Sequence, residues 1–190
     1  MTVLRSFFVL LAAILLGAAT QAGSSYVVDS AASNVSAKVP FLGIGSRTAG
    51  FPDLSGSVRL SPTDPGRLDL DVRINARALT ASDKTTRDRL RGEKFFWVEK
   101  YPTVRFKGSR MQLRDGRRGT VKGVLTARGV SKPVTLNVTF DKAPASLPAG
   151  APVTLTGTTS INRRDFGMKS YSLIVGKTVS ITLKAKLRPR

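Results

Sequence analysis

Residues that could do chemistry are few in this chain, which has no His and no Cys. It therefore lacks the commonest general base at neutral pH, the usual zinc ligands and any thiol nucleophile. The carboxylates Asp83, Asp88, Glu93 and Glu99 fall close together, but Lys and Arg are interleaved with them, as on a solvated, ion-paired surface. The sequence also lacks glycine motifs that bind phosphates or dinucleotides. We therefore predict a protein that is not an enzyme and has no cofactor and no metal site.

One polar cluster could contact a ligand. Asn162, Arg163, Arg164 and Asp165 come where a predicted strand gives way to a loop. The arginines could hold an oxygen-rich group through charge-assisted hydrogen bonds. Alternatively, the Asn and Asp side chains could stabilise a turn by accepting hydrogen bonds from backbone N–H groups. The sequence leaves both interpretations open, and we favour the structural one.

The segments that must position these residues alternate between apolar and polar side chains. The clearest case is the apolar series Leu68, Leu70, Val72, Ile74 and Ala76, with charged or amide side chains between its members. The pattern recurs over residues 134–140 and 179–187. Such alternation places the apolar side chains on one face of a β-strand, so the chain encloses an apolar interior. Periodicity alone does not tell whether that interior is packed or open to a ligand.

Turn residues such as Asp115-Gly116 and Arg128-Gly129 separate the candidate strands. We expect strands at 26–29, 34–39, 56–61, 67–77, 104–113, 119–127, 133–142, 153–161 and 178–187. Thr80-Ala81-Ser82-Asp83 offers a capping box, which predicts a short helix over residues 84–90. Short connections favour antiparallel neighbours. The fold class is therefore all-β, and the pattern fits either a closed barrel or a two-layer sandwich.

The first 22 residues have the organisation of a secretory signal peptide, with Arg5, an apolar stretch from Phe7 and small residues up to Ala22. The apolar stretch of about ten residues is shorter than the roughly 18 that a spanning helix needs. We expect cleavage after Ala22 and a single domain over residues 23–190 in a bacterial periplasm. The mature chain would carry 30 Lys and Arg against 12 Asp and Glu, formally +18. Such an excess attracts anionic lipid headgroups and envelope polyanions.

Several motifs in a fixed order along the chain carry a family resemblance. They are Tyr26-Val27-Val28-Asp29, the segment 86–106 with Phe95-Phe96-Trp97 at its centre, the segment 123–134, and Asn162-Arg163-Arg164-Asp165-Phe166-Gly167. Together they resemble the YceI-like family of exported, lipocalin-like proteins that bind polyisoprenoid lipids. The resemblance covers nearly all of residues 23–190. The chain departs from the family pattern at Arg89, where a His is frequent, and at Lys177, where an acidic residue is common.

The resemblance implies an eight-stranded antiparallel, lipocalin-like barrel with one short helical insert and an apolar tunnel that holds an isoprenoid chain. Apolar side chains near the motifs are the expected contacts, with plain core packing as the alternative for each. The expected ligand-binding residues are Phe41, Phe51, Phe95, Phe96, Trp97, Phe106, Phe166, Met168 and Leu173, together with Asn162 and Arg163 at a polar rim.

We therefore expect a periplasmic carrier of a long isoprenoid lipid, either an isoprenoid quinone or a polyprenyl phosphate. An anionic membrane surface and a second copy of the chain are further partners that the sequence allows, whereas nucleic acid is not expected. One alternative is an interaction protein with a packed barrel, whose basic surface binds anionic membranes or envelope polyanions. The other is an enzyme acting on lipids through a buried polar residue such as Asp165.

Overall fold

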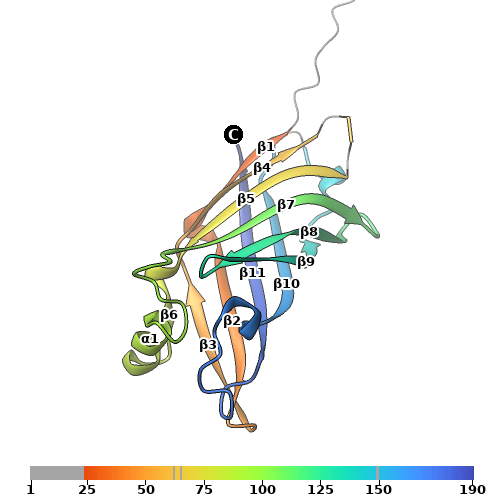
Figure 1. The fold of residues 1–190 in the computed structure, drawn as a ribbon. Helices are drawn as coiled ribbons and strands as arrows, with labels where there is room; N and C mark the ends of the chain where they lie inside the picture. Colours follow the sequence, from red (N-terminus) through yellow and green to blue (C-terminus); the bar gives the residue numbers. More distant parts are fainter. Residues whose placement is uncertain (1–23, 62, 65, 149) are drawn as a thin grey trace, which may run out of the picture.

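The computed structural model describes residues 24–61, 63–64, 66–148 and 150–190. The predicted signal peptide at 1–22 lies outside the described residues. Within them, eleven strands form one antiparallel sheet (Figure 1). The strands are β1 (Ser25–Val28), β2 (Asn34–Phe41), β3 (Gly45–Phe51), β4 (Leu54–Leu60), β5 (Arg67–Asn75), β6 (Thr80–Ala81), β7 (Thr103–Leu113), β8 (Arg118–Ala127), β9 (Val130–Phe140), β10 (Val153–Asn162) and β11 (Thr178–Pro189).

The sheet closes on itself because β1 pairs with both β4 and β11. β1 and β2 lie along different parts of β11 and form one strand interrupted by a 3-10 turn at Ser30–Ala32. β3 and β4 likewise form one strand that bends between Phe51 and Leu54. The result is a closed ring of eight strands in the order β1/β2, β3/β4, β5, β7, β8, β9, β10 and β11. The predicted all-β barrel is confirmed, and the sandwich alternative is wrong.

Local sequence explains the tight turns between neighbouring strands. Arg128 and Gly129 connect β8 to β9 with φ values of 50° and 74°, the left-handed pair that a two-residue hairpin needs. At the β7–β8 turn, the Asp115 carboxylate accepts hydrogen bonds from the backbone N–H groups of Arg117 and Arg118, at 3.2 and 2.7 Å. Both turns occur where the sequence predicts them.

The helical insert α1 (Lys84–Arg91) lies beside β6 on one side of the barrel (Figure 1). The Asp83 side chain caps it by accepting a hydrogen bond from the backbone N–H of Thr86, at 2.7 Å. The predicted helix is confirmed, but a cap at Thr80 is wrong, because Thr80 and Ala81 pair with β3 as β6. None of the expected strands covers β3 or β6. No helix among the described residues is long and apolar enough to cross a bilayer.

Buried apolar side chains form two clusters along the barrel interior. One cluster gathers near α1 and contains Leu54, Val98 and Phe166 among its most buried members. We call this side of the barrel the helix end. The other cluster, with Phe140 and Leu187 among its members, lies towards β1, where Arg190 donates a backbone hydrogen bond to Ser25. We call it the termini end. Phe106 and Leu183 pack against both clusters, so the interior is continuous.

Candidate ligand cavity

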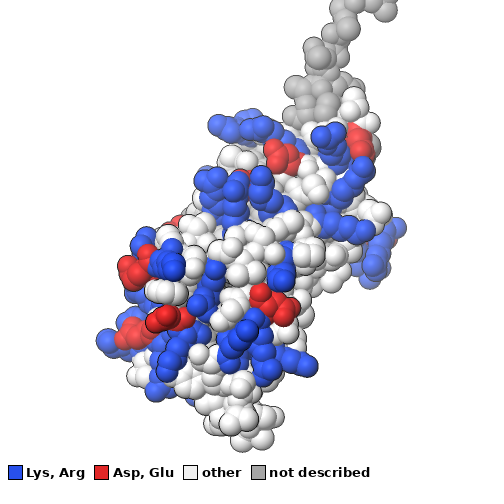
Figure 2. Space-filling model, viewed as in Figure 1, with Lys and Arg blue, Asp and Glu red and all other residues white. Residues whose placement is uncertain are grey.

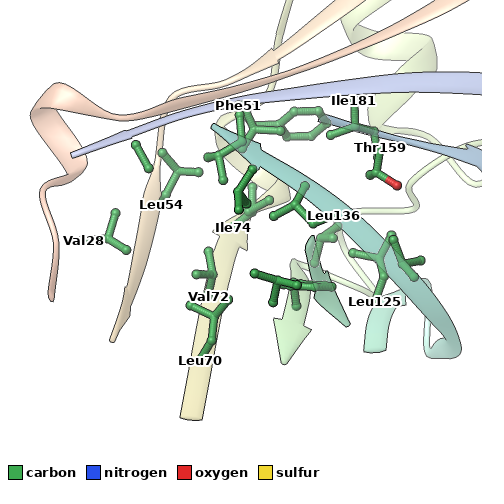
Figure 3. Close-up of a pocket in the computed structure, with 18 of the residues that line it drawn as sticks. Val28, Phe51, Leu54, Leu70, Val72, Ile74, Leu125, Leu136, Thr159 and Ile181 are labelled. Atoms are coloured by element: carbon green, nitrogen blue, oxygen red, sulfur yellow. The ribbon is translucent and has the colours of Figure 1, made fainter. Parts of the chain in front are cut away.

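A cavity of about 490 Å³ lies inside the barrel. This volume falls within the roughly 300–1,000 Å³ that is usual for small-molecule pockets. Figure 3 shows side chains from several strands converging on it, with the hydroxyl of Thr159 as the one oxygen in this cut-away view. The interior is therefore open rather than packed, which decides the question that periodicity leaves open. The packed-barrel alternative does not fit the structure.

Strand alternation builds the cavity walls. The apolar faces predicted for β5, β9 and β11 all point inwards, with the exception of Ala76, which is fully buried beside the cavity. The members that line the cavity are Leu68, Leu70, Val72, Ile74, Val134, Leu136, Val138, Phe140, Val179, Ile181, Leu183, Ala185 and Leu187. Most of the predicted ligand contacts are aromatic and none of these lining residues is among them, although strand alternation is the signal that identifies them.

Aromatic side chains concentrate at the helix end of the cavity. Phe51 and Phe96 meet edge to face, with ring centroids 5.4 Å apart. Phe95 stacks on Tyr171 at 5.9 Å, which joins the segment after α1 to the loop before β11. Met168 lies against the same cavity end and is 5% exposed. These rings form a firm apolar wall made by segments that are distant in sequence.

Arg163 is a buried cation at this end of the cavity. Its side chain lines the cavity although the residue is only 2% exposed. The guanidinium donates hydrogen bonds to the backbone carbonyls of Gly176 and Val175, both at 2.9 Å, and to that of Met168. The ring of Phe95 lies 6.0 Å from the guanidinium carbon. These bonds tie the 3-10 turn η4 (Arg163–Phe166) to the loop that leads into β11.

The charge on Arg163 has no counter-ion within the described part of the chain. Burial lowers the pKa of the Arg163 guanidinium, and the neighbouring charge of Arg164 lowers it further. An arginine nevertheless stays protonated in proteins, and three of its five N–H donors are used by the carbonyls. Arg47 also lines the cavity. Its guanidinium lies over the ring of Phe41, and Phe41 forms a β-bridge with Val175, one of the residues whose carbonyl binds Arg163. Arg47 is therefore at the same end of the cavity as Arg163.

The termini end of the cavity has a different character. Tyr26, Leu60 and Leu155 line it together with Pro144 and Leu147 of the loop between β9 and β10. Within the described residues, the charged side chains that line the cavity are Arg47 and Arg163, both at the helix end. The cavity is therefore polarised, with cationic and aromatic groups at one end and mainly aliphatic groups at the other.

The structure brings together six of the eleven predicted ligand-binding residues. These six line the cavity: Phe51, Phe95, Phe96, Phe106, Arg163 and Met168. Their contact with a ligand remains a prediction. Each of them lies in the cavity wall, where a bound ligand would be within reach.

The other five predicted residues lie outside the cavity. Leu173 is 99% exposed on the loop before β11, and Phe41 lies at the end of β2 under Arg47. Trp97 adopts φ 49° in a turn, and its ring packs against Tyr101 instead. Phe166, the last residue of η4, fills the core and is 2% exposed. Asn162 accepts a hydrogen bond from the backbone N–H of Arg164 at 3.1 Å, which is the turn-stabilising role.

Three of the four clustered carboxylates have structural partners. Asp83 caps α1, Asp88 pairs with Lys84 at 2.7 Å, and Glu99 lies 3.7 Å from Arg77. Asp165 is exposed, so the expectation that it is a buried polar residue is wrong. The buried polar residue of that motif is Arg163.

A closed eight-stranded antiparallel barrel around an apolar cavity is the architecture of lipocalin-like binding proteins. The sequence profile of the YceI-like domain matches residues 26–187, which include all or most of every strand of the barrel. The chain belongs to the YceI-like family.

Known proteins share this fold and part of this sequence. A UPF0312 protein from Pseudomonas savastanoi pv. phaseolicola is 26% identical over 157 residues, which is 82% of each chain. Burkholderia cenocepacia BcnA is 27% identical in its crystal structure, with a TM-score of 0.71 over 84% of this chain and 98% of that one. A polyisoprenoid binding domain from Saccharophagus degradans, implicated in plant cell wall breakdown, has a TM-score of 0.66 over 87% of this chain and 98% of its own. Its 16% identity shows the shared fold alone.

Proposed function

We propose that this protein binds one long isoprenoid lipid in its barrel and carries it through the periplasm, without catalysing a reaction. The observation that carries the proposal is the apolar cavity of about 490 Å³. The structural neighbour described as a polyisoprenoid binding domain supports the choice of ligand class.

Estimated binding free energies favour a lipid with a long isoprenoid tail over one with a short tail. One isoprene unit of five carbons contributes roughly 4 kcal/mol on burial, at ~0.8 kcal/mol per carbon. Association costs about 4–15 kcal/mol in lost freedom of motion. A single unit would therefore bind weakly at best, and several units in the cavity are needed before affinity becomes useful. The walls offer little hydrogen bonding, so affinity rests on apolar burial.

The polarity of the cavity orients the proposed ligand. A headgroup rich in carbonyl or phosphate oxygens would lie at the helix end, where Arg47 and Arg163 line the cavity. The tail would then extend towards the termini end, past Leu136 and Val138. Both an isoprenoid quinone and a polyprenyl phosphate satisfy this arrangement, because both accept hydrogen bonds from guanidinium groups.

The first test is mass spectrometry of an organic extract of the protein purified from a bacterial periplasm, with native mass spectrometry of the intact complex. We expect one isoprenoid lipid per chain, and the extract would identify its headgroup. A protein that is empty, and stays empty after incubation with quinones and polyprenyl phosphates, would contradict the proposal.

A matched pair of variants ties that lipid to the cavity. Ala185→Trp places a large ring in the cavity from β11, whereas Thr158→Trp adds the same ring to an exposed position on β10. We expect Ala185→Trp to stay folded and lose most of its bound lipid, and Thr158→Trp to keep it. Equal lipid content in the two variants would show that the lipid binds elsewhere.

A further inference from the structure

An exposed apolar tip projects from the helix end of the barrel. It consists of Leu42 and Ile44 from the turn between β2 and β3, with Leu173 and Ile174 from the loop before β11. Ile44 and Leu173 are 98% and 99% exposed, and Leu42 and Ile174 are 57% and 38% exposed. Most large apolar side chains in this barrel are buried or partly buried, so such a group calls for an explanation beyond folding.

Backbone hydrogen bonds join the two segments that form the tip. The backbone N–H of Leu42 donates to the Ile174 carbonyl at 2.8 Å, and that of Gly176 donates to the Pro40 carbonyl at 2.9 Å. Leu42 and Tyr171 adopt φ values of 54° and 56°, a left-handed conformation that is unfavourable for bulky residues. Strain of this kind persists where the surrounding structure imposes it, and it concentrates at functional segments.

Basic residues surround the base of the tip. Lys38 and Arg47 lie on β2 and β3, Lys169 and Lys177 flank the second loop, and Lys94 lies 5.4 Å from the ring of Tyr171. All five are exposed, and none forms an ion pair with a described residue. Figure 2 shows a white lower end, where β2 and β3 meet in Figure 1, and above it many Lys and Arg side chains with fewer Asp and Glu among them.

We infer that this tip inserts into an anionic lipid bilayer. Aliphatic side chains would enter the acyl boundary while Lys and Arg contact the anionic headgroups, the combination that holds proteins at membrane interfaces. A second copy of the chain fits less well, because two such tips would bring their unpaired cations together.

The position of the tip connects it with the cavity. Val39, Arg47 and Val175 line the cavity and lie only a few residues from the tip on the same two segments. A docked protein would therefore hold the charged end of its cavity against the bilayer surface. An isoprenoid lipid could then exchange between membrane and barrel over a short path. Docking itself does not depend on the identity of the bound ligand.

The test measures binding to vesicles by flotation. The full chain is expressed in bacteria, purified, and checked by mass spectrometry for the identity of its N-terminus. The probes are vesicles of phosphatidylcholine alone and vesicles with phosphatidylglycerol added. We expect binding to the anionic vesicles that weakens but persists as salt is raised, since salt screens only the charge contribution. Absence of binding to anionic vesicles would overturn the inference.

Variants of the apolar side chains locate the binding surface. We expect Ile44→Ser combined with Leu173→Ser to lower vesicle binding by at least about tenfold, because affinity grows with the apolar area inserted. The control is Leu113→Ser combined with Val124→Ser, which changes two exposed apolar residues elsewhere on the barrel. Equal losses in the two variants would overturn the inference. So would a wild-type dimer that dissociates only in the tip variant, measured by analytical ultracentrifugation.

Variants of the charges separate a local basic surface from overall charge. Lys169→Glu combined with Lys177→Glu should reduce binding to anionic vesicles by at least about tenfold. The control, Lys122→Glu combined with Lys184→Glu, changes net charge equally at exposed positions on the barrel wall. If both pairs reduce binding equally, overall charge alone drives association and the tip has no special role. Lipid content, measured separately, reports on the cavity.

Discussion

The two ends of the cavity differ in chemistry and in origin. The termini end is mainly aliphatic and is formed by regular strands, through residues such as Val58, Leu136 and Leu187. The helix end contains stacked aromatic rings and the buried cation of Arg163, and non-periodic segments contribute much of it. A regular strand can offer a smooth apolar wall, whereas a polar contact at a chosen place requires an irregular segment held by side-chain bonds.

The two ends of the cavity would therefore contribute differently to ligand binding. The termini end supplies affinity by burying the ligand's chain, and the helix end supplies orientation through a few polar groups. Changes at the helix end should therefore affect stability and ligand orientation, whereas changes at the termini end should affect affinity for the ligand's chain.

The largest expected effect is the loss of folding stability caused by Arg163→Met at the helix end. The change removes hydrogen bonds to three backbone carbonyls, and the buried carbonyls lose their partner. Each unsatisfied group costs about 1–3 kcal/mol, so we expect the free energy of unfolding to fall by ~4 kcal/mol. Urea denaturation measures this change.

The control for Arg163→Met is Arg164→Met. Arg164 is the next residue and carries the same charge, but its side chain is exposed. We expect a change of less than about 0.5 kcal/mol for this variant. Equal stability of the two variants would show that the carbonyl bonds of Arg163 do not hold the helix end together.

A moderate loss of ligand affinity is expected from Val138→Trp at the termini end. Val138 lines the cavity on β9, so a larger ring at this position would project into the cavity. The ring would shorten the space for a tail, so affinity for a long isoprenoid should fall by about tenfold, or ~1.4 kcal/mol. Affinity for a short-chain analogue with the same headgroup should change little. Titration calorimetry with the two ligands measures the difference, and equal losses would argue against a tail at this end.

The smallest expected effect is a loss of stability in acid where β1 pairs with β11 and closes the barrel at the termini end. Asp29 at the end of β1 accepts a hydrogen bond from Arg188 of β11 at 2.8 Å. This bond holds the pKa of the Asp29 carboxyl below its ordinary value of 3.8, with burial opposing the shift. A lowered pKa contributes stability that is present above about pH 3.8 and is lost as the pH falls through the folded-state value. We therefore expect the protection of β1 amides against hydrogen exchange, relative to their intrinsic exchange rate at each pH, to fall in acid.

Asp29→Asn isolates that contribution. The variant should be less stable than the wild-type protein at neutral pH, and the difference should shrink as the pH falls below the ordinary carboxyl pKa. Protection of the loop that Arg163 holds should change less over the same range, because a guanidinium does not titrate there. A stability difference that is constant from neutral pH into acid would exclude the carboxylate as its cause.

The sequence predicted the fold and the termini end well because strand alternation is a local signal. Leu70, Val72 and Val138 could be assigned to an inner face from their neighbours alone. Arg163 could not be placed in this way, because its acceptors are carbonyls of a loop that becomes adjacent only after folding. Leu173 was assigned to the cavity because its side chain is apolar, and residue type does not report exposure.

The start of β1 and the C-terminal residue lie together at the termini end of the barrel, where Arg190 donates a backbone hydrogen bond to Ser25 at 2.9 Å (Figure 1). Domains with adjacent termini often tolerate circular permutation. A short linker could therefore join residue 190 to residue 24, with new ends opened in the loop between β9 and β10. A fusion partner attached after residue 190 would lie on the side opposite the exposed apolar residues. The protein could then be immobilised for ligand screening with that surface and the charged end of the cavity free.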